Sequence, residues 1–246
     1  MLKNSRLAVL MILLTLPGQI HAGRVIGGHE AKKHSRPYMV LLEMHNLGGT
    51  KTFCGGFLLN ENFMMTAAHC QANSYSVKLG LHNKQDHIDD TISVQKAFPH
   101  TEYDSATYNN DIMLLKLSPK VNINDNVKPI ALADHDTEFL PQNCSVSGWG
   151  ETNWTTKLLP SKLMEINVTL KDDVLCKNAK SYCSVGNTGP GQGDSGGPLV
   201  CEDGRAFGVV SSFFRINDTA KFRYTKIPDF QDWIKSTMKK ALKMNQ

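Results

Sequence analysis

Three short motifs, far apart in the chain, each contain a residue type found in nucleophilic catalytic sites. They are TAAHC (66–70) with His69, NNDIMLL (109–115) with Asp111, and GDSGGP (193–198) with Ser195. A serine hydroxyl is a weak nucleophile until a neighbouring base removes its proton, and imidazole, with an unperturbed pKa of about 6.5, suits that task. A carboxylate on the other ring nitrogen would fix the imidazole tautomer and stabilise its charged form. If the fold brings them together, these residues predict attack of a serine on a carbonyl group.

The stretch GQGDSGGPLV (191–200) surrounds Ser195 with very little side-chain bulk. Glycine is favoured where φ must be positive, so one interpretation is a tight turn that opens into a strand. The alternative is that a substrate carbonyl must approach this backbone closely, beside N–H donors. The other two motifs also have ordinary interpretations, as a packed core histidine beside a cysteine and as an aspartate that caps a strand. Only the conjunction of the three motifs favours catalysis.

Most of the chain has the pattern of short strands. Residues 163–170, LMEINVTL, alternate apolar and polar side chains, which is the period of a half-buried strand. Further β-prone runs bounded by turn residues lie at 76–80, 111–117 and 206–212. Many short strands with turn punctuation predict an all-β sandwich or barrel. The one predicted helix follows Pro228-Asp229, where apolar residues recur at helical spacing, and the segment 118–142 is predicted to connect two halves.

The motifs resemble those of the chymotrypsin-like serine proteases. The resemblance is carried by TAAHC, NNDIMLL, SGWG (147–150) and GDSGGPLVC (193–201), in the order His, Asp, Ser that this family uses. It extends from Val25 to the C-terminal helix, and VIGGHEAKKHSRPYMVLL (25–42) is similar to the granzyme and mast-cell chymase group. The resemblance implies two antiparallel six-stranded β-barrels with a C-terminal helix. The first barrel would span about 25–127, and the second barrel with the helix about 128–246.

The resemblance also implies a role for each site residue. His69 would be the general base, Asp111 its orienting partner and Ser195 the nucleophile. The backbone N–H groups of Gly193 and Ser195 would form the oxyanion hole, which explains the glycines around the serine. Ser211 matches the family serine that supports the buried aspartate and borders the substrate channel.

The N-terminus has the features of an exported precursor. Residues 1–22 combine early basic residues, an apolar run shorter than the ~20 residues needed to cross a bilayer, and a small residue before the cut, as in a secretory signal peptide. Residues 23–24 would be an activation dipeptide. By resemblance, cleavage after Arg24 frees the α-amino group of Val25, which inserts and pairs with Asp194. We therefore expect an inactive zymogen whose product is secreted or stored in secretory granules.

Six cysteines in an exported chain favour disulfides over metal ligation, but spacing alone leaves 15 connectivities open. The resemblance implies three pairs, which are Cys54–Cys70, Cys144–Cys201 and Cys176–Cys183. The third pair encloses only six residues, so the loop beside the specificity pocket is expected to be short.

The specificity pocket departs from the family pattern. Its floor aligns with Gly189, and the lack of an acidic residue there argues against cleavage after Arg or Lys. Phe213 stands where a glycine is usual, and Phe222 adds bulk nearby. We expect a narrow pocket that takes a small or medium apolar residue. A closed pocket is the alternative, and it would give a catalytically weak or silent granule binding protein on the same fold.

Charge adds little to this assignment. The formal charge of +4 falls to +1 when residues 1–24, with their three basic residues, are removed, which gives no argument for nucleic acid. The lysine clusters are usually solvated surface, and anionic glycans are the alternative partners. These clusters are Lys32-Lys33-His34 and Lys239, Lys240 and Lys243. The expected partners are therefore protein or peptide substrates, serpin-type inhibitors and anionic glycans, with no membrane span.

Four sequons suit a secreted glycoprotein, and they begin at Asn143, Asn153, Asn167 and Asn217. The Asp/His-rich stretch DHIDD (86–90) matches no metal-ligand spacing, so a solvated loop is expected there. No cofactor or metal is expected.

Overall fold

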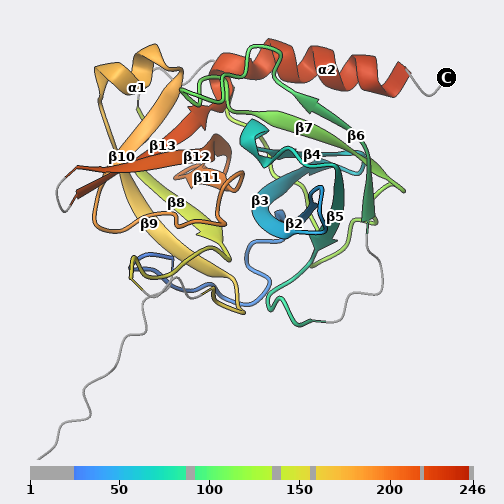
Figure 1. The fold of residues 1–246 in the computed structure, drawn as a ribbon, viewed down its shortest axis with the longest axis horizontal. Coiled ribbons are helices and arrows are strands. Elements are labelled where there is room, and N and C mark those ends of the chain that lie inside the picture. Colours follow the sequence, from blue (N-terminus) through green and yellow to red (C-terminus); the bar gives the residue numbers. More distant parts are fainter. Residues whose placement is uncertain (1–24, 87–91, 135–139, 156–158, 217–218, 244–246) are drawn as a thin grey trace, which may run out of the picture.

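A computed structural model describes residues 25–86, 92–134, 140–155, 159–216 and 219–243. The predicted signal peptide and activation dipeptide, Arg24, Asn217 and most of the DHIDD stretch lie outside the described residues. Two β-barrels lie side by side, and a C-terminal helix crosses one end of the first (Figure 1). The predicted fold of two six-stranded antiparallel barrels with a C-terminal helix is confirmed.

The first barrel is closed, with antiparallel strands in the order β2-β3-β4-β7-β6-β5. Its core is apolar and is continued by residues of the C-terminal helix. The strands are β2 (Met39–His45), β3 (Lys51–Asn60), β4 (Phe63–Thr66), β5 (Ser74–Leu79), β6 (Ile92–Pro99) and β7 (Met113–Ser118).

The second barrel has the order β9-β10-β13-β12-β11-β8, and the pairing of β8 with β9 closes it. A two-residue strand, β1 (His29–Glu30), adds to the edge of β9. The strands of the barrel are β8 (Asn143–Gly148), β9 (Met164–Lys171), β10 (Ser181–Gly186), β11 (Pro198–Cys201), β12 (Ala206–Ile216) and β13 (Thr219–Lys226).

Burial explains which strands the sequence pattern revealed. In β9 the apolar positions Met164, Ile166, Val168 and Leu170 are buried, and the residues between them are at least partly exposed, as the alternation predicted. In β7 every residue from Met113 to Leu117 is buried, because one face points into the barrel and the other lies beneath the C-terminal helix. Such a strand reads as a continuous apolar run.

The helix α2 (Gln231–Lys243) lies where its period predicted it. It is fastened to the first barrel by Lys116 of β7, whose buried ammonium donates a hydrogen bond to the carbonyl of Ala241 at 2.8 Å. A short helix that the sequence did not predict, α1 (Val174–Asn178), is only five residues long, too short to show a helical period. Asp173 caps its N-terminus by accepting a hydrogen bond from the backbone of Cys176.

Candidate active site

The two barrels meet at the three motifs. His69 lies in a 3-10 turn, Ala68–Cys70, directly after β4, and the disulfide Cys54–Cys70 fixes this turn to β3. Asp111 lies two residues before β7, the strand that pairs with β4. Neighbouring strands therefore bring together two residues that are 42 positions apart. The His69 Nδ1 atom lies 2.7 Å from Asp111 Oδ2, and the His69 backbone N–H donates to Asp111 Oδ1 at 2.9 Å.

The Asp111 carboxylate is completely buried and hydrogen-bonded from both barrels. Ser211 of β12 donates to its Oδ2 atom at 2.6 Å, as expected for the supporting serine. Thr225 of β13 donates to the backbone carbonyl of Asp111 at 2.9 Å, a contact that the sequence did not reveal. A buried charge is stable only when such partners compensate it, and the same partners fix its orientation.

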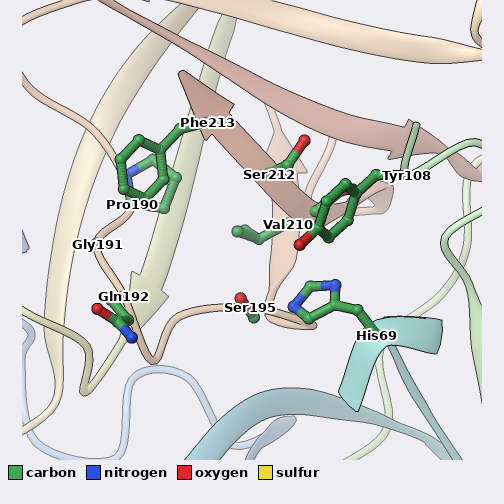
Figure 2. Close-up of a pocket in the computed structure, with 10 residues that line it drawn as sticks. His69, Tyr108, Pro190, Gly191, Gln192, Ser195, Val210, Ser212 and Phe213 are labelled. Carbon is green, nitrogen blue, oxygen red and sulfur yellow. The ribbon is translucent and has the colours of Figure 1, made fainter. Parts of the chain in front are cut away.

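Ser195 lies on the turn between Gly191 and β11, at the same cavity as His69. Figure 2 shows Ser195 between His69 and Tyr108 on one side and Pro190 and Phe213 on the other. The Ser195 carbonyl accepts a hydrogen bond from Gly55 of β3 at 2.7 Å, so the first barrel holds the turn directly. The edge of the Tyr108 ring lies against His69, with the ring centroids 5.5 Å apart.

Two glycines of this turn have backbone conformations that a side chain would strain. Gly193 has a φ of 100°, and a Cβ added there would lie 3.2 Å from the Cα of Gly150. Gly196 has a φ of 83°, and its Cβ would lie 2.1 Å from the hydroxyl of Thr66. The interpretation of the glycine-rich stretch as a tight turn is therefore confirmed, because the turn needs positive φ at both glycines. The approach of a substrate carbonyl remains a prediction.

Asp194 is buried and points away from the cavity into the protein. Its two carboxylate oxygens accept hydrogen bonds of 2.7 Å from the backbone N–H groups of Gly150 and Gly191. Burial nevertheless raises its pKa to about 6. Val25 is also buried, and the carbonyl of the next residue accepts a hydrogen bond from Gly189 at 3.1 Å. The segment that follows the predicted cleavage site thus docks beside the loop that leads to Asp194.

The cavity beside Ser195 has a volume of about 210 Å³, and Phe213 forms part of its wall. Gly189 and Phe222, which the sequence placed in the pocket, are not among its lining residues. The Phe222 ring is fully buried, and a Cβ on Gly189 would lie 2.6 Å from it. Phe222 fills the space behind Phe213, with the ring centroids 6.1 Å apart, so the cavity does not extend past Phe213 in that direction.

Trp154 closes the same region from outside, which the sequence did not indicate. Its ring packs edge-on against Phe213 at 5.3 Å, and its indole N–H donates to the carbonyl of Asn187. The guanidinium of Arg215 lies 4.8 Å from the centroid of the Trp154 ring, a cation–π contact. These contacts hold Phe213 in place in the wall of the cavity.

The remaining candidate residues lie away from the cavity. The disulfides are Cys54–Cys70, Cys144–Cys201 and Cys176–Cys183, the pairing that the resemblance implied. Within the described ranges, the one cluster of metal-ligand types contains His69 and the disulfide Cys54–Cys70, whose sulfurs are already bonded to each other. The sequon residues Asn143, Asn153 and Asn167 are exposed. Asn143 and Asn167 lie on the same outer face of paired strands β8 and β9.

A family model described as Trypsin matches residues 25–234, which includes both barrels and all three motifs. The chain belongs to the trypsin family of serine proteases. Granzyme B of Rattus norvegicus is 40% identical over 96% of this chain and 100% of its own length. Duodenase-1 of Bos taurus is 41% identical over 95% of this chain and 96% of its own, and mast cell protease 3 of Ovis aries is 40% identical over 94% and 95%.

A solved structure described as "Structure of GrC" has the same fold, with a TM-score of 0.78 and 37% identity. It covers 87% of this chain and 100% of its own. Together with the sequence relatives, it places the chain among trypsin-family endopeptidases of the granzyme and chymase group.

Proposed function

We propose that the processed protein hydrolyses peptide bonds through an acyl-enzyme formed on Ser195. The observation that carries this proposal is the buried Asp111 carboxylate, 2.7 Å from one ring nitrogen of His69, at a cavity that both His69 and Ser195 line. An imidazole held in this way presents its second nitrogen to the cavity as a base.

The proposed reaction begins when the Ser195 hydroxyl attacks the substrate carbonyl carbon and its proton passes to Nε2 of His69. The carbonyl oxygen becomes an oxyanion, which the backbone N–H groups of Gly193 and Ser195 would stabilise. His69 then gives the proton to the leaving amine as the C–N bond breaks, leaving an ester on Ser195. A water molecule, deprotonated by His69, hydrolyses the ester and restores the enzyme.

The proposed preference for the residue before the cut bond is a small or medium apolar side chain. The cavity of about 210 Å³ supports it, because Phe213 narrows the cavity and, among the residues that the structure describes, no carboxylate lines it to attract Arg or Lys. Peptide-library cleavage by the processed protein tests this preference. We expect residues such as Ala or Val before the cut bond, and little cleavage after Phe, Arg or Lys.

Shortening Phe213 should widen the specificity of the enzyme. For Phe213→Gly we expect kcat/KM on peptides with Phe or Leu before the cut bond to rise about tenfold or more, since a change of pocket size is worth about 1–3 kcal/mol. Phe214→Gly is the matched control, because Phe214 is the next residue in β12, equally exposed, and is absent from the cavity lining. Equal profiles for the Phe213 variant and wild type would show that Phe213 does not set the preference.

We further propose that the protein is made as a zymogen. Cleavage before Val25 would create an ammonium group, and the buried Asp194 carboxylate would become its partner. Two observations support this switch. The carbonyl of Ile26 accepts a hydrogen bond from Gly189, in the loop that leads to Asp194, and burial raises the pKa of the Asp194 carboxyl to about 6. A buried ion pair is tolerable only when both members are present, so the cut would supply the cationic partner that the buried Asp194 carboxylate lacks in the uncut chain.

This switch predicts opposite pH dependences of stability before and after the cut. In the uncut chain the pKa of Asp194 is about 6 folded, against an ordinary value of 3.8, so the folded state holds the proton longer. The contribution of Asp194 to the free energy of unfolding is therefore greatest below pH 4 and falls between pH 4 and 6, by about 3 kcal/mol in all. In the cut protein the Val25 ammonium should remove this loss.

Denaturant unfolding at pH 4, 5, 6 and 7 of the uncut wild type and Asp194→Asn measures the effect as a difference between the two proteins. From pH 4 to pH 6 the free energy of unfolding of the wild type should fall relative to that of Asp194→Asn, and it should do so in the uncut form only. The same relative fall in the cut form would contradict the ion pair between the Val25 ammonium and Asp194.

The relatives named granzyme and mast cell protease support a secreted or granule-stored location. None of the helices in the described parts of the chain has the length and apolar character to span a bilayer. The proposed partners, besides peptide substrates, are serpin-type inhibitors and, through the lysine clusters, anionic glycans.

A further inference from the structure

A second cleft, of about 300 Å³, begins beside Gly193, the glycine of the proposed oxyanion hole. It lies between the two barrels, and its lining includes Leu41, Phe53, Lys84, Trp149, Gln192 and Gly193. Gln192 lines both this cleft and the cavity beside Ser195, so the two hollows adjoin at the 191–195 turn.

The position of this cleft decides which part of a substrate would enter it. The carbonyl under attack must lie between Ser195 and the Gly193 N–H, and the cavity with Phe213 takes the side chain on the acyl side. An extended substrate continues past Gly193, so its first residues after the cut bond pass over the second cleft. Because extended chain advances about 3.3 Å per residue, one or two residues reach it.

Lys84 is the unusual group in this cleft. Its ammonium donates a hydrogen bond to the Trp149 carbonyl at 3.0 Å and lies 5.7 Å from the centroid of the Phe53 ring. Partial burial lowers its pKa, and the charge of the Asp194 carboxylate opposes that shift without forming an ion pair within the described ranges. Lys51, the other lysine of the cleft, is different, because Glu43 neutralises it at 2.7 Å.

The fold holds the Lys84 ammonium in place. The Trp149 carbonyl and the Gly150 N–H belong to one peptide group. The carbonyl accepts a hydrogen bond from Lys84, and the N–H donates one to Asp194 at 2.7 Å. One peptide unit thus joins Lys84 to the carboxylate beneath the 191–195 turn. An ammonium has three N–H donors and Trp149 uses one, so two remain for water or a ligand.

We propose that Lys84 makes this cleft a subsite for an acidic substrate residue, within the first two positions after the cut bond. A substrate carboxylate would give Lys84 a direct ion-pair partner, which the described residues do not supply, in a place where water is partly excluded. Glu151 also lines the cleft and would repel a substrate carboxylate, but it forms no ion pair with Lys84. The acidic side chain of the substrate therefore belongs at the end of the cleft where Lys84 lies over Phe53. This inference rests on the proposed function of Ser195.

The test compares peptides that share one acyl-side sequence and carry Glu or Gln at the first or the second position after the cut bond. For the processed wild type we expect kcat/KM to favour Glu at one position by about fivefold to tenfold, an advantage that added salt reduces. Lys84→Gln should bring the ratio close to one, Lys84→Arg should keep it, and Glu151→Gln should raise it.

Lys78→Gln is the matched control, because Lys78 loses the same charge outside the cleft and its partner is Glu43. It should leave the Glu/Gln ratio unchanged. A wild-type ratio near one at both positions overturns the proposal, and so does an unchanged ratio in Lys84→Gln. If Lys84→Gln does not fold, the Glu/Gln ratios of wild type and Glu151→Gln still test the subsite, and a ratio near one in both overturns it.

Labelling of Ser195 by a fluorophosphonate in each protein distinguishes a failure of the Lys84 subsite from a failure of the proposed Ser195 function. Labelled enzyme without a preference for Glu contradicts only the role of Lys84. Absence of labelling in processed wild type contradicts the proposed function itself.

Discussion

Ser195→Ala in the processed protein should lower kcat for peptide hydrolysis by about 10⁶, the loss expected when the nucleophile of a triad is removed. Alanine has no atom that can form the acyl-enzyme, and nothing else at the cavity replaces it. The folded structure should persist, because the Ser195 backbone carbonyl still accepts its hydrogen bond from Gly55. Residual hydrolysis would come from substrate binding and the oxyanion donors alone.

Ser212→Ala is the matched control for this experiment. Ser212 lines the same cavity but lies on β12, at the wall rather than at the turn. Its loss should change kcat/KM only a few-fold. Comparable losses in the two variants would mean that cavity shape, and not the Ser195 hydroxyl, carries the activity. Initial rates on one fluorogenic peptide, with matched unfolding midpoints, give the comparison.

Asp111→Asn should lower kcat by about 10⁴ with little loss of folded protein. The His69 backbone N–H needs an acceptor at the place of Oδ1, so the asparagine oxygen takes that place. The amide NH2 group then faces His69 Nδ1 at the place of Oδ2, where it cannot accept a proton, and the imidazole is left in the wrong tautomer. His69 would then present a proton, and not a lone pair, to Ser195. The loss should shrink at alkaline pH, where hydroxide can take over the role of the misoriented His69 base.

The control for this variant is Asp125→Asn, which removes the same charge from a fully exposed site on the segment between the barrels. It should keep wild-type activity. If Asp111→Asn lost less than tenfold in kcat while remaining folded, the buried carboxylate would have no role in orienting His69. Steady-state kinetics from pH 6 to pH 10 on both variants make this measurement.

The parts of the fold that the sequence revealed are those with local periodicity. The alternation in β9 and the helical spacing in α2 follow directly from one buried face in each. The helix α1 escaped because five residues are too few for a period, and β7 lost its alternation because both of its faces are buried.

The site was predictable to the extent that its residues stand in short motifs. His69, Asp111 and Ser195 are each marked by neighbouring residues, and the structure brings the first two into contact. Thr225 and Lys84 are in no motif, because their contacts arise from strand register and from loop packing between barrels. The pocket shows the same limit, since Phe222 was expected in the lining but fills the space behind it.

The most direct test of the account uses a fluorophosphonate probe, which reacts with a serine only when a neighbouring base activates it. The protein is labelled before and after a verified cut preceding Val25, and the modified peptide is mapped by mass spectrometry. The account predicts rapid labelling at Ser195 after the cut, much slower labelling before it, and none in Ser195→Ala. Correctly cut, folded protein that stays unlabelled, or that is labelled at another serine, would contradict it.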